Sequence, residues 1–219
     1  GRPEMPHSWS ELATPLGKWK TGWNAFFGYA DGSGRTRGQS PPTEAADVPD
    51  EGYPDGLIAA AAVEKLRELK GREEPFVLAV GFYKPHLPFN APQKYWDLYD
   101  PQRLPPALYS QKPEGIAPQS YHTSGEMFRN YQHPPDSRRD EEHHRHLRKV
   151  LAAVDDLGLR NNTIVVVWGD HGWHLGDHDI WGKHTLFERA LRSALIIRTP
   201  ETPQPGVPTD GIVETLDLY

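Results

Sequence analysis

The sequence predicts an α/β fold, in which a mostly parallel central sheet is flanked by helices and joined by long proline-rich loops. Two helical patterns, over residues 55–70 and 141–157, alternate with three apolar strand patterns, over residues 76–82, 163–168 and 194–198. Alternation of this kind is typical of a sheet that is covered by helices. The 22 Pro and 20 Gly residues indicate that long irregular segments connect these elements.

The N-terminal quarter is predicted to be rich in loops, because Pro and Gly recur at short intervals over residues 1–56. Within it, the aromatic residues of segment 22–29 could form a short strand. The first helix follows over residues 55–70, where apolar side chains repeat at helical spacing and charged side chains lie outside the stripe. The apolar stripe consists of Ile58, Ala62, Leu66 and Leu69.

The segment 76–82 is uniformly apolar and follows a proline, as in a buried, parallel strand. Residues 83–140 are predicted to form a proline-rich loop, and so long a loop is usually functional or poorly ordered. The helix pattern over 141–157 begins with a His-rich tract, from His143 to His146, that resembles a metal site. Helical spacing spreads these rings around the axis, so we interpret the tract as a solvated face.

Composition excludes several classes of protein. The formal net charge of −6 argues against a nucleic-acid-binding surface, which is normally basic. The sequence has no apolar run long enough to predict a membrane span. Because the chain has no Cys, disulfides, thiolate metal sites and a cysteine nucleophile are excluded within it.

The most informative segment follows the strand predicted at 163–168. There Gly169-Asp170-His171-Gly172 places a carboxylate and an imidazole between glycines that let the backbone turn. Buried strands of α/β proteins end at the edge of the sheet where ligands bind, so Asp170 and His171 are candidate metal ligands. The alternative is a strand end at which Asp170 caps a turn, and the two residues alone leave both interpretations open.

Basic side chains are predicted to meet the same edge of the sheet. Lys84 and His86 follow the strand at 76–82, in a segment that two prolines stiffen. Lys183 and His184 lie shortly beyond the Asp-His pair. Either basic pair could instead be solvated in an ordinary loop. A metal ion and a positive charge at one strand end suggest hydrolysis of an anionic ester.

Taken together, these segments resemble the sulfatase family of the alkaline-phosphatase-like superfamily, and most closely its iduronate-2-sulfatase-like branch. Two blocks are specific in combination: Lys84-Pro85-His86 within residues 81–89, and the Gly-Asp-His-Gly-Trp block of residues 169–178 with Trp181-Gly182-Lys183-His184. Residues 6–10, 48–56 and 214–219 also match. The resemblance implies that residues 1–219 are the central-to-late part of one sulfatase catalytic domain, truncated at both ends.

The resemblance also implies a chemistry. Sulfatases of this kind hydrolyse sulfate esters with formylglycine, an aldehyde residue made after translation from Cys or Ser. A Ca²⁺ ion binds both this nucleophile and the sulfate. By position, Asp170 and His171 would be two of the calcium ligands, and the carboxylate suits a hard cation better than the imidazole does.

The same resemblance assigns roles to the basic residues. Lys183 would hold the sulfate and stabilise the charge that grows in the transition state. His86 would contact the sulfate and protonate the leaving alcohol. Lys84 would be its neighbour in the catalytic group, and His184 would face the substrate.

The sequence departs from the family pattern in three ways. The N-terminal part, with its paired Asp ligands and its Cys-x-Pro-Ser-Arg nucleophile motif, has no match. Ser40-Pro41-Pro42-Thr43-Glu44 has Pro at the required offset but Glu44 in place of Arg, so we reject it as the motif. The helix before residue 150 is shorter than the family's, as if several turns had been deleted. We therefore expect no catalysis from the chain as printed.

Two classes of function remain open. The first is a sulfuric ester hydrolase that removes sulfate from a sulfated small molecule or glycan, with a phosphodiester or phosphonate monoester hydrolase of the same superfamily as an alternative. The second is a catalytically inactive remnant that binds an anion. The resemblance implies a lysosomal, secreted or periplasmic protein.

Overall fold

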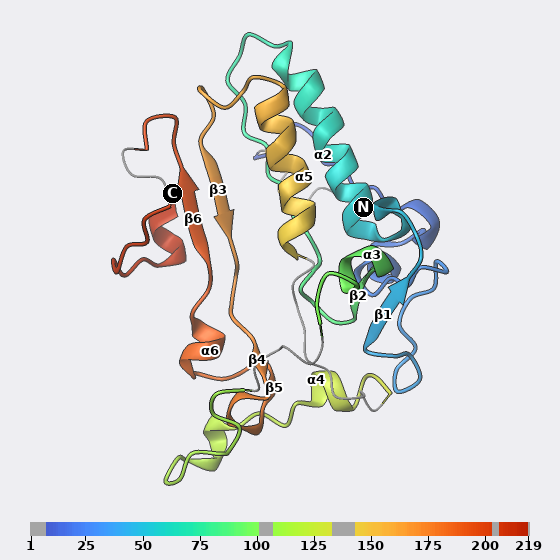
Figure 1. The fold of residues 1–219 in the computed structure, drawn as a ribbon, viewed down its shortest axis with the longest axis vertical. Helices are drawn as coiled ribbons and strands as arrows, with labels where there is room; N and C mark the ends of the chain where they lie inside the picture. Colours follow the sequence, from blue (N-terminus) through green and yellow to red (C-terminus); the bar gives the residue numbers. More distant parts are fainter. Residues whose placement is uncertain (1–7, 101–106, 133–142, 203–205, 219) are drawn as a thin grey trace.

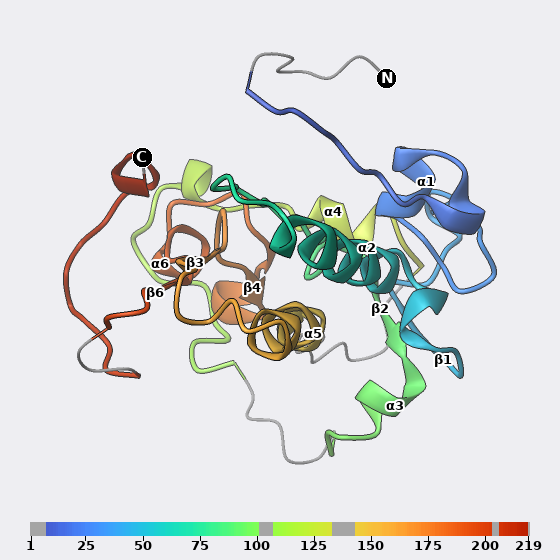
Figure 2. The same cartoon turned by 90° about the horizontal axis from the view of Figure 1, so that it is seen from above.

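The computed structural model describes residues 8–100, 107–132, 143–202 and 206–218, with the backbone alone for 143–148. Two long helices lie side by side in the middle of the molecule, with a two-stranded sheet to each side (Figure 1, Figure 2). The helices are α2 (Pro54–Lys70) and α5 (His143–Asp156). The strands are β1 (Thr43–Ala46) with β2 (Phe89–Pro92), and β3 (Val165–Trp168) with β6 (Leu195–Arg198).

The predicted α/β fold is confirmed, since helices and strands alternate along the chain and pack together. Strands β1 and β2 are parallel, and β3 and β6 are antiparallel, with Val166 opposite Ile197. A third pair, β4 (His174–Leu175) and β5 (Trp181–Gly182), is also antiparallel. Within the described part of the chain, parallel pairing is therefore confined to β1 and β2, whereas the sequence predicts a mostly parallel sheet.

Short helices occupy the segments that are predicted to be loops. The strand suggested for 22–29 is wrong, because residues Gly22–Phe26 form helix α1. Thr21 caps this helix, since its hydroxyl accepts a hydrogen bond of 3.1 Å from the amide of Asn24. The other short helices are η1 (Gly17–Trp19), η2 (Asp50–Gly52), α3 (Gln93–Trp96), η4 (Pro118–Ser120), α4 (Gly125–Phe128), η5 (Asp177–Asp179), α6 (Glu188–Leu191) and η6 (Thr215–Leu218).

The first predicted helix is confirmed as α2, which begins at Pro54. Proline suits this position because the first turn of a helix leaves its amide groups unpaired. Two residues of the predicted apolar stripe, Ala62 and Leu66, are 6% and 3% exposed and belong to the core between α2 and α5. Figure 1 shows the two helices in contact along much of their length. They form the main hydrophobic core of the described residues together with Leu159.

The second predicted helix is confirmed from His143 to Asp156, as α5. The part of the prediction before His143 lies outside the described residues, as do the side chains of the His-rich tract. Val150 and Val154 of α5 are 9% and 6% exposed and belong to the main core. Within the described ranges, no helix combines the length and the apolar character that crossing a bilayer requires.

The strand predicted at 76–82 is wrong. The segment is irregular, although alternate side chains from Phe76 to Phe82 pack against the core while Val77 is 84% exposed. No described strand forms a ladder of backbone hydrogen bonds with it. The apolar pattern thus identified which side chains are buried. It could not predict a strand, because a strand also needs a neighbouring strand with which to form hydrogen bonds.

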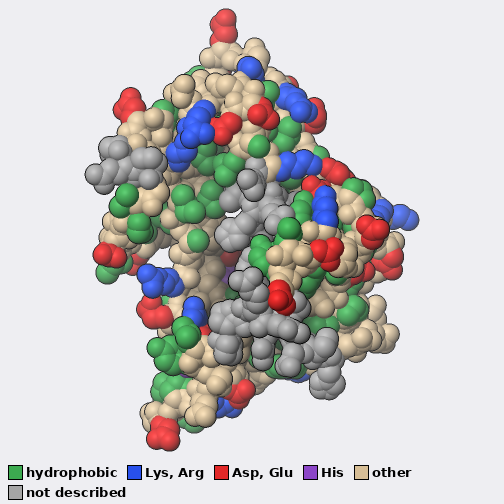
Figure 3. All heavy atoms as spheres, in the orientation of Figure 1, with side chains coloured by type: hydrophobic (Ala, Val, Ile, Leu, Met, Phe, Trp, Pro, Cys, Tyr) green, Lys and Arg blue, Asp and Glu red, His purple; other side chains and the backbone are tan. Residues whose placement is uncertain are grey.

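Strands β3 and β6 form a ribbon with an uncovered side, whereas the sequence predicts that both are buried. Val166, Trp168 and Ile197, which share one face of the ribbon, are between 46% and 51% exposed, and Ile196 on the opposite face is 61% exposed. In Figure 3, hydrophobic side chains gather on the left of the molecule, where Figure 1 draws this ribbon. A continuous run of apolar residues predicts a strand that is covered on both faces. It does not reveal whether another layer of the protein actually covers the second face of the sheet.

The region 83–140 contains more structure than a loop, since it includes β2, α3 and α4. A second hydrophobic core forms here from residues that are far apart in the sequence. Its buried members are Leu87, Phe89, Met127 and Tyr131, against which Trp173, Leu175 and Trp181 pack. This second core lies beneath the polar side chains described next.

Candidate functional site

The start of helix α2 holds the segment that carries Lys84 and His86. Asp55, in the first turn of the helix, is 2% exposed. Its two carboxylate oxygens accept hydrogen bonds of 2.9 Å from the backbone amides of Tyr83 and Lys84. A carboxylate that receives two backbone donors fixes the chain at that point. The position of His86 is therefore tied to the helical core.

Lys84 is a structural residue of this segment. Its side chain is 4% exposed, and Nζ donates hydrogen bonds to the backbone carbonyls of His86 at 3.1 Å and Pro88 at 2.5 Å. A buried ammonium group needs such acceptors, because burial without them is costly. Lys84 does not line the cavity described below, and its predicted catalytic role stays a prediction.

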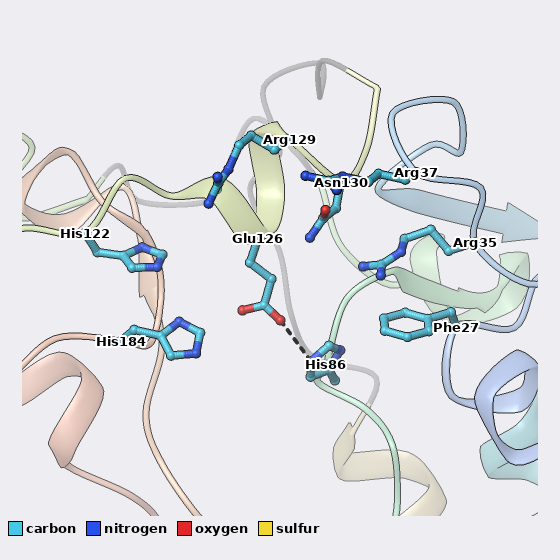
Figure 4. Close-up of a pocket in the computed structure, with 10 residues that line it drawn as sticks. Phe27, Arg35, Arg37, His86, His122, Glu126, Arg129, Asn130 and His184 are labelled. Atoms are coloured by element: carbon cyan, nitrogen blue, oxygen red, sulfur yellow. Dashed lines mark ion pairs between the residues drawn. The ribbon is translucent and has the colours of Figure 1, made fainter.

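Glu126, which the sequence analysis missed, joins His86 to Lys183. Its Oε1 lies 2.9 Å from Nε2 of His86 and 3.9 Å from Nζ of Lys183. Figure 4 shows the carboxylate of Glu126 pointing from α4 toward His86. The second oxygen, Oε2, is buried and has no hydrogen-bond partner. Two residues predicted from the sequence are thus brought together by a third.

The electrostatics of Glu126 follow from these contacts. Burial alone would raise the pKa of Glu126, but the hydrogen bond from His86 and the charges of Lys183, His86 and His184 outweigh it. The pKa therefore lies below the ordinary value of 4.5. Glu126 remains a carboxylate at neutral pH.

Helix α4 is held in place by β5 and by the second core. The hydroxyl of Ser124, just before α4, accepts a hydrogen bond of 2.9 Å from the amide of Trp181. Met127, next to Glu126, is fully buried. The helix is too short for periodicity to reveal it, so the only sequence signal was an acidic residue beside buried apolar ones. Such a signal does not single out Glu126 from other carboxylates.

A cavity of about 480 Å³ opens beside Glu126. It lies between the N-terminal loops, α4 and the segment after β5, and Figure 4 shows the labelled side chains around it. The charged and polar residues that line it are Arg35, Arg37, His86, His122, Glu126, Arg129, Asn130 and His184. Pockets of this size accommodate small organic ligands.

One wall of the cavity is a pair of imidazoles. The rings of His122 and His184 are stacked, with their centroids 5.1 Å apart. Burial, and then the charge of His184, lower the pKa of His122 below 6.5, so His122 is neutral at pH 7. A Cβ atom at Gly182, where φ is +148°, would lie 3.1 Å from the His122 ring. Glycine at this position therefore permits the close approach of the two segments. His184 lines the cavity, and its predicted role in facing the substrate stays a prediction.

Three arginines contribute positive charge to the cavity. The guanidinium of Arg35 lies over the rings of Phe27, at 3.9 Å, and Tyr131, at 5.3 Å. These contacts hold its plane against aromatic faces. No carboxylate of the described residues forms an ion pair with Arg35, Arg37 or Arg129. The cavity is accordingly suited to an anion.

Asp170 and His171 follow strand β3, as the sequence predicts. Nδ1 of His171 lies 2.7 Å from the carbonyl oxygen of Gly172, an arrangement that leaves a lone pair on Nε2. Nε2 lies 3.6 Å from Oδ1 of Asp170, whose side chain is 74% exposed. The tautomer suits a metal ligand, but no hydrogen bond from another described residue orients the Asp170 carboxylate.

Trp173 lies between the Asp-His pair and Lys183. The ring of Trp173 lies 6.2 Å from that of His171, and Nζ of Lys183 lies 5.3 Å from it. No hydrogen bond or ion pair between described residues joins Asp170 to His86 or Lys183. The structure therefore gathers His86, Lys183 and His184 around Glu126, and the ring of Trp173 contacts both Lys183 of this group and His171.

The described residues do not form a calcium site by themselves. They contain no cluster of three or more His, Cys, Asp or Glu side chains with the spacing of metal ligands. Calcium takes six to eight ligands, mostly oxygens, so Asp170 and His171 would supply a minority of them. Their assignment as ligands stays a prediction.

The turn after the Asp-His pair requires glycine. A Cβ atom at Gly172 would lie 2.0 Å from the carbonyl oxygen of Arg189, which belongs to α6. The amide of Gly172 instead donates a hydrogen bond of 2.8 Å to the carbonyl of Ala190. Helix α6 thus packs directly on the backbone that follows His171.

The segment rejected as a nucleophile motif has a structural role. Oε2 of Glu44 accepts hydrogen bonds from the amide of Ala30 at 2.7 Å and from the hydroxyl of Tyr53 at 2.8 Å. The hydroxyl of Ser40 accepts one from the amide of Thr36 at 2.8 Å. These bonds connect β1 to the N-terminal loops and to the start of α2.

Comparison with known proteins identifies the family. The profile named Sulfatase matches residues 7–219. Iduronate 2-sulfatase from Mus musculus is 31% identical over 185 residues, which cover 75% of this chain and 34% of that protein. A sulfatase from Formosa agariphila is 32% identical over 177 residues, covering 68% of this chain and 32% of that protein.

A more distant relative belongs to the wider superfamily. The multifunctional alkaline phosphatase superfamily protein of Trinickia caryophylli is 27% identical over 178 residues, which cover 70% of this chain and 34% of that protein. The chain thus spans about a third of the length of these curated relatives. Because the family profile extends over almost all of it, the chain belongs to the sulfatase family.

Proposed function

We propose that this chain forms part of the active centre of a sulfuric ester hydrolase that removes sulfate from a sulfated sugar. The single observation that carries the proposal is the cluster of His86, Lys183 and Glu126 beside a cavity lined with arginines, in a chain of the sulfatase family. The cavity can hold an anion, and the cluster provides a proton donor and a cation at its edge.

His86 is the proton donor in this proposal. Nδ1 lies 2.8 Å from the carbonyl oxygen of Leu87, and Nε2 lies 2.9 Å from the carboxylate of Glu126. Both ring nitrogens therefore face acceptors, an arrangement that the doubly protonated imidazolium satisfies. An imidazolium can protonate the leaving alcohol when the ester bond breaks.

Lys183 supplies the positive charge for the sulfate group. Its side chain is 17% exposed, and Glu126 and the Trp173 ring hold it in place. An ammonium group held in this way stabilises the charge that develops on the sulfate oxygens. Asp170 and His171 would supply two ligands of a calcium ion, which in this family polarises the sulfate. The other ligands and the formylglycine have no counterpart among the described residues.

The test uses a polypeptide that extends this chain to the length of its relatives. The DNA upstream is searched for a Cys-x-Pro-Ser-Arg motif, and the extended protein is assayed with 4-nitrophenyl sulfate and sulfated uronate oligosaccharides. We expect sulfate release, and its loss in His86→Gln. Failure to hydrolyse any sulfate ester contradicts the proposal. Faster hydrolysis of 4-nitrophenyl phosphate or of a phosphodiester would favour the alternative within the superfamily.

The second candidate is an inactive remnant that binds an anion, since the arginine-lined cavity could hold an anion without a nucleophile. A remnant would keep the cavity and its arginines but would lack the nucleophile. An intact upstream motif argues against it. A frameshift or stop codon in that DNA would support it.

A further inference from the structure

One buried histidine holds both ends of the segment that carries Lys183 and His184. The backbone of His174, in β4, pairs with Gly182, in β5, which directly precedes Lys183 (Figure 1). The side chain of the same histidine reaches Thr185, which directly follows His184. Its Nε2 lies 2.8 Å from the hydroxyl oxygen of Thr185. Lys183 and His184 thus lie between two attachments to a single residue.

The hydrogen bonds of His174 have a defined direction. Its Nδ1 lies 3.2 Å from the carbonyl oxygen of Asp177, which can only accept, so Nδ1 carries the proton. In a neutral ring Nε2 then has a lone pair, and it accepts a hydrogen bond from the hydroxyl of Thr185. The oxygen of Thr185 in turn accepts one of 3.4 Å from the amide of Phe187. Both ring nitrogens and the hydroxyl group therefore have partners.

His174 is neutral at pH 7, as this network requires. Its side chain is fully buried, and burial is the main cause that lowers its pKa below 6.5. The charges of His178 and Arg189 add to this effect, whereas the carbonyl group and the charge of Asp177 oppose it. A second proton, on Nε2, would leave the hydroxyl hydrogen of Thr185 without its acceptor. The network is complete only with the neutral ring.

The anchored segment carries two basic side chains of the candidate site. Nζ of Lys183 lies 3.9 Å from Oε1 of Glu126. His184 lines the cavity and stacks on His122. The amide of Thr185 also donates a hydrogen bond of 2.8 Å to the carbonyl of Lys183, so the threonine fixes the backbone of the lysine directly. A shift of Thr185 would therefore move the ammonium group and the imidazole together.

We propose that His174 and Thr185 are positioning residues, whose hydrogen bond holds the ammonium group of Lys183 where the sulfate of the substrate binds. The proposal rests on the proposed function, which places the sulfate at Lys183. It adds that the affinity for sulfate depends on two side chains that do not line the cavity. A cation that is held in place binds an anion more tightly, because less conformational freedom is lost on binding.

The first measurement needs no substitution. Long-range proton–nitrogen NMR spectra of the chain at pH 7 distinguish the two neutral tautomers of a histidine ring. We expect the tautomer of His174 that carries its proton on Nδ1, with Nε2 as the acceptor. A proton on Nε2 at pH 7 overturns the proposal, because the hydroxyl of Thr185 would then have no lone pair to which it could donate.

The second measurement follows the binding of inorganic sulfate at Lys183. Sodium sulfate is titrated into the isotope-labelled chain at constant ionic strength, and the NMR signal of the Lys183 ammonium group gives the dissociation constant. Thr185→Val removes the hydroxyl and keeps nearly the same shape, so it is expected to weaken sulfate binding about fivefold, the scale of one hydrogen bond. Thr185→Ser keeps the hydroxyl and should remain within about twofold of the parent chain.

Thr202→Val is the matched control, because it removes a partly buried threonine hydroxyl, bonded to Thr199, from the turn after β6. It should leave sulfate binding unchanged, and circular dichroism checks that each variant is folded. Three results overturn the proposal: equal affinity in Thr185→Val and the parent, a loss in Thr185→Ser as large as in Thr185→Val, or no response of Lys183 to sulfate.

The extended protein separates this proposal from the proposed function. Hydrolysis of 4-nitrophenyl sulfate with the same kcat/KM in Thr185→Val and in the parent would keep the function and reject the positioning role. Absence of hydrolysis of any sulfate ester, together with the weaker sulfate binding of Thr185→Val, would reject the function and keep the positioning role.

Discussion

The helical core and the cavity region of this molecule are built in different ways. Helices α2 and α5 pack through apolar side chains that repeat along each helix, so each helix prepares its own contact surface. The cavity region instead joins His86, Glu126 and Lys183, which are far apart in the sequence and lie in short or irregular elements. The repeating apolar pattern in the sequence is therefore enough to define the helical core. The charged cluster, by contrast, is formed only when the folded chain brings its three residues together.

The largest expected effect is a loss of stability when a core residue is shortened. Comparing the two cores shows whether that loss also affects ligand binding. Leu66→Ala, in the helical core, should lower the free energy of unfolding by about 2–5 kcal/mol, because it leaves a cavity between the helices. Met127→Ala, in the second core, should lower the free energy of unfolding by a similar amount and also weaken binding of a sulfated sugar, because it displaces Glu126 from His86 and Lys183. Urea unfolding and calorimetry of the folded protein measure the two effects.

Leu12→Ala is the control for both variants, because Leu12 is 69% exposed. It should change neither stability nor binding appreciably. If Leu66→Ala weakened binding as much as Met127→Ala does, the two regions would not be separable.

The next effect concerns the acid stability of the cavity region. Glu126→Gln should lower the free energy of unfolding at pH 7 by about 1–3 kcal/mol, because Lys183 loses its buried acidic partner. The pKa of Glu126 is below 4.5, so its stabilising contribution is complete above pH 4.5 and is lost as pH falls through the lowered pKa. The variant should therefore show a flatter decrease in stability between pH 5 and pH 3 in urea unfolding.

Glu64→Gln, on the exposed surface of α2, serves as its control and should keep the slope of the parent chain. Identical slopes for Glu126→Gln and the parent would refute the electrostatic account of the cluster.

A smaller effect is expected at His122. Its lowered pKa means that the unfolded chain binds a proton more readily, so stability should decrease as pH falls below about 6.5 toward that pKa. Burial is the main cause, and the charge of His184 adds to it. His184→Gln should therefore raise the pKa of His122 only slightly, which an NMR titration of the imidazole can detect. A further decrease in the pKa of His122 in this variant would contradict the view that the charge of His184 lowers it.

The smallest effect is expected for calcium. Asp170 and His171 offer two ligands, so the chain alone should bind calcium no more tightly than about 1 mM, the weak end of the range for protein sites. Titration calorimetry with calcium chloride, compared with Asp170→Asn, measures this. Tight binding with one ion per chain would show that the described residues already provide a complete site.

The same contrast explains what could be predicted from the sequence. The helices at 55–70 and 143–156 follow from spacing alone, because a helix forms its own hydrogen bonds. The prediction of a strand at 76–82 was wrong, because a strand depends on a partner elsewhere in the chain and the described strands do not pair with this segment. The helix α1 was missed because aromatic residues favour strands, whereas the cap at Thr21 decided the local structure.

The candidate site was predictable where a motif marked it. His86 and Lys183 were identified from the family resemblance, and the structure brings them to one carboxylate. Glu126 and the three arginines lie in segments without a recognisable pattern, so only the three-dimensional arrangement reveals them. Lys84 was identified by the same motif as His86, but its burial and carbonyl contacts show that it shapes the segment.

The two hydrogen bonds that Asp55 accepts have a mechanical consequence. They clamp the first turn of α2 to the backbone just ahead of His86, so a small rotation of the helix displaces the imidazole by a comparable amount. Substitutions deep between the helices could then alter proton donation remotely, without touching any group around the ester.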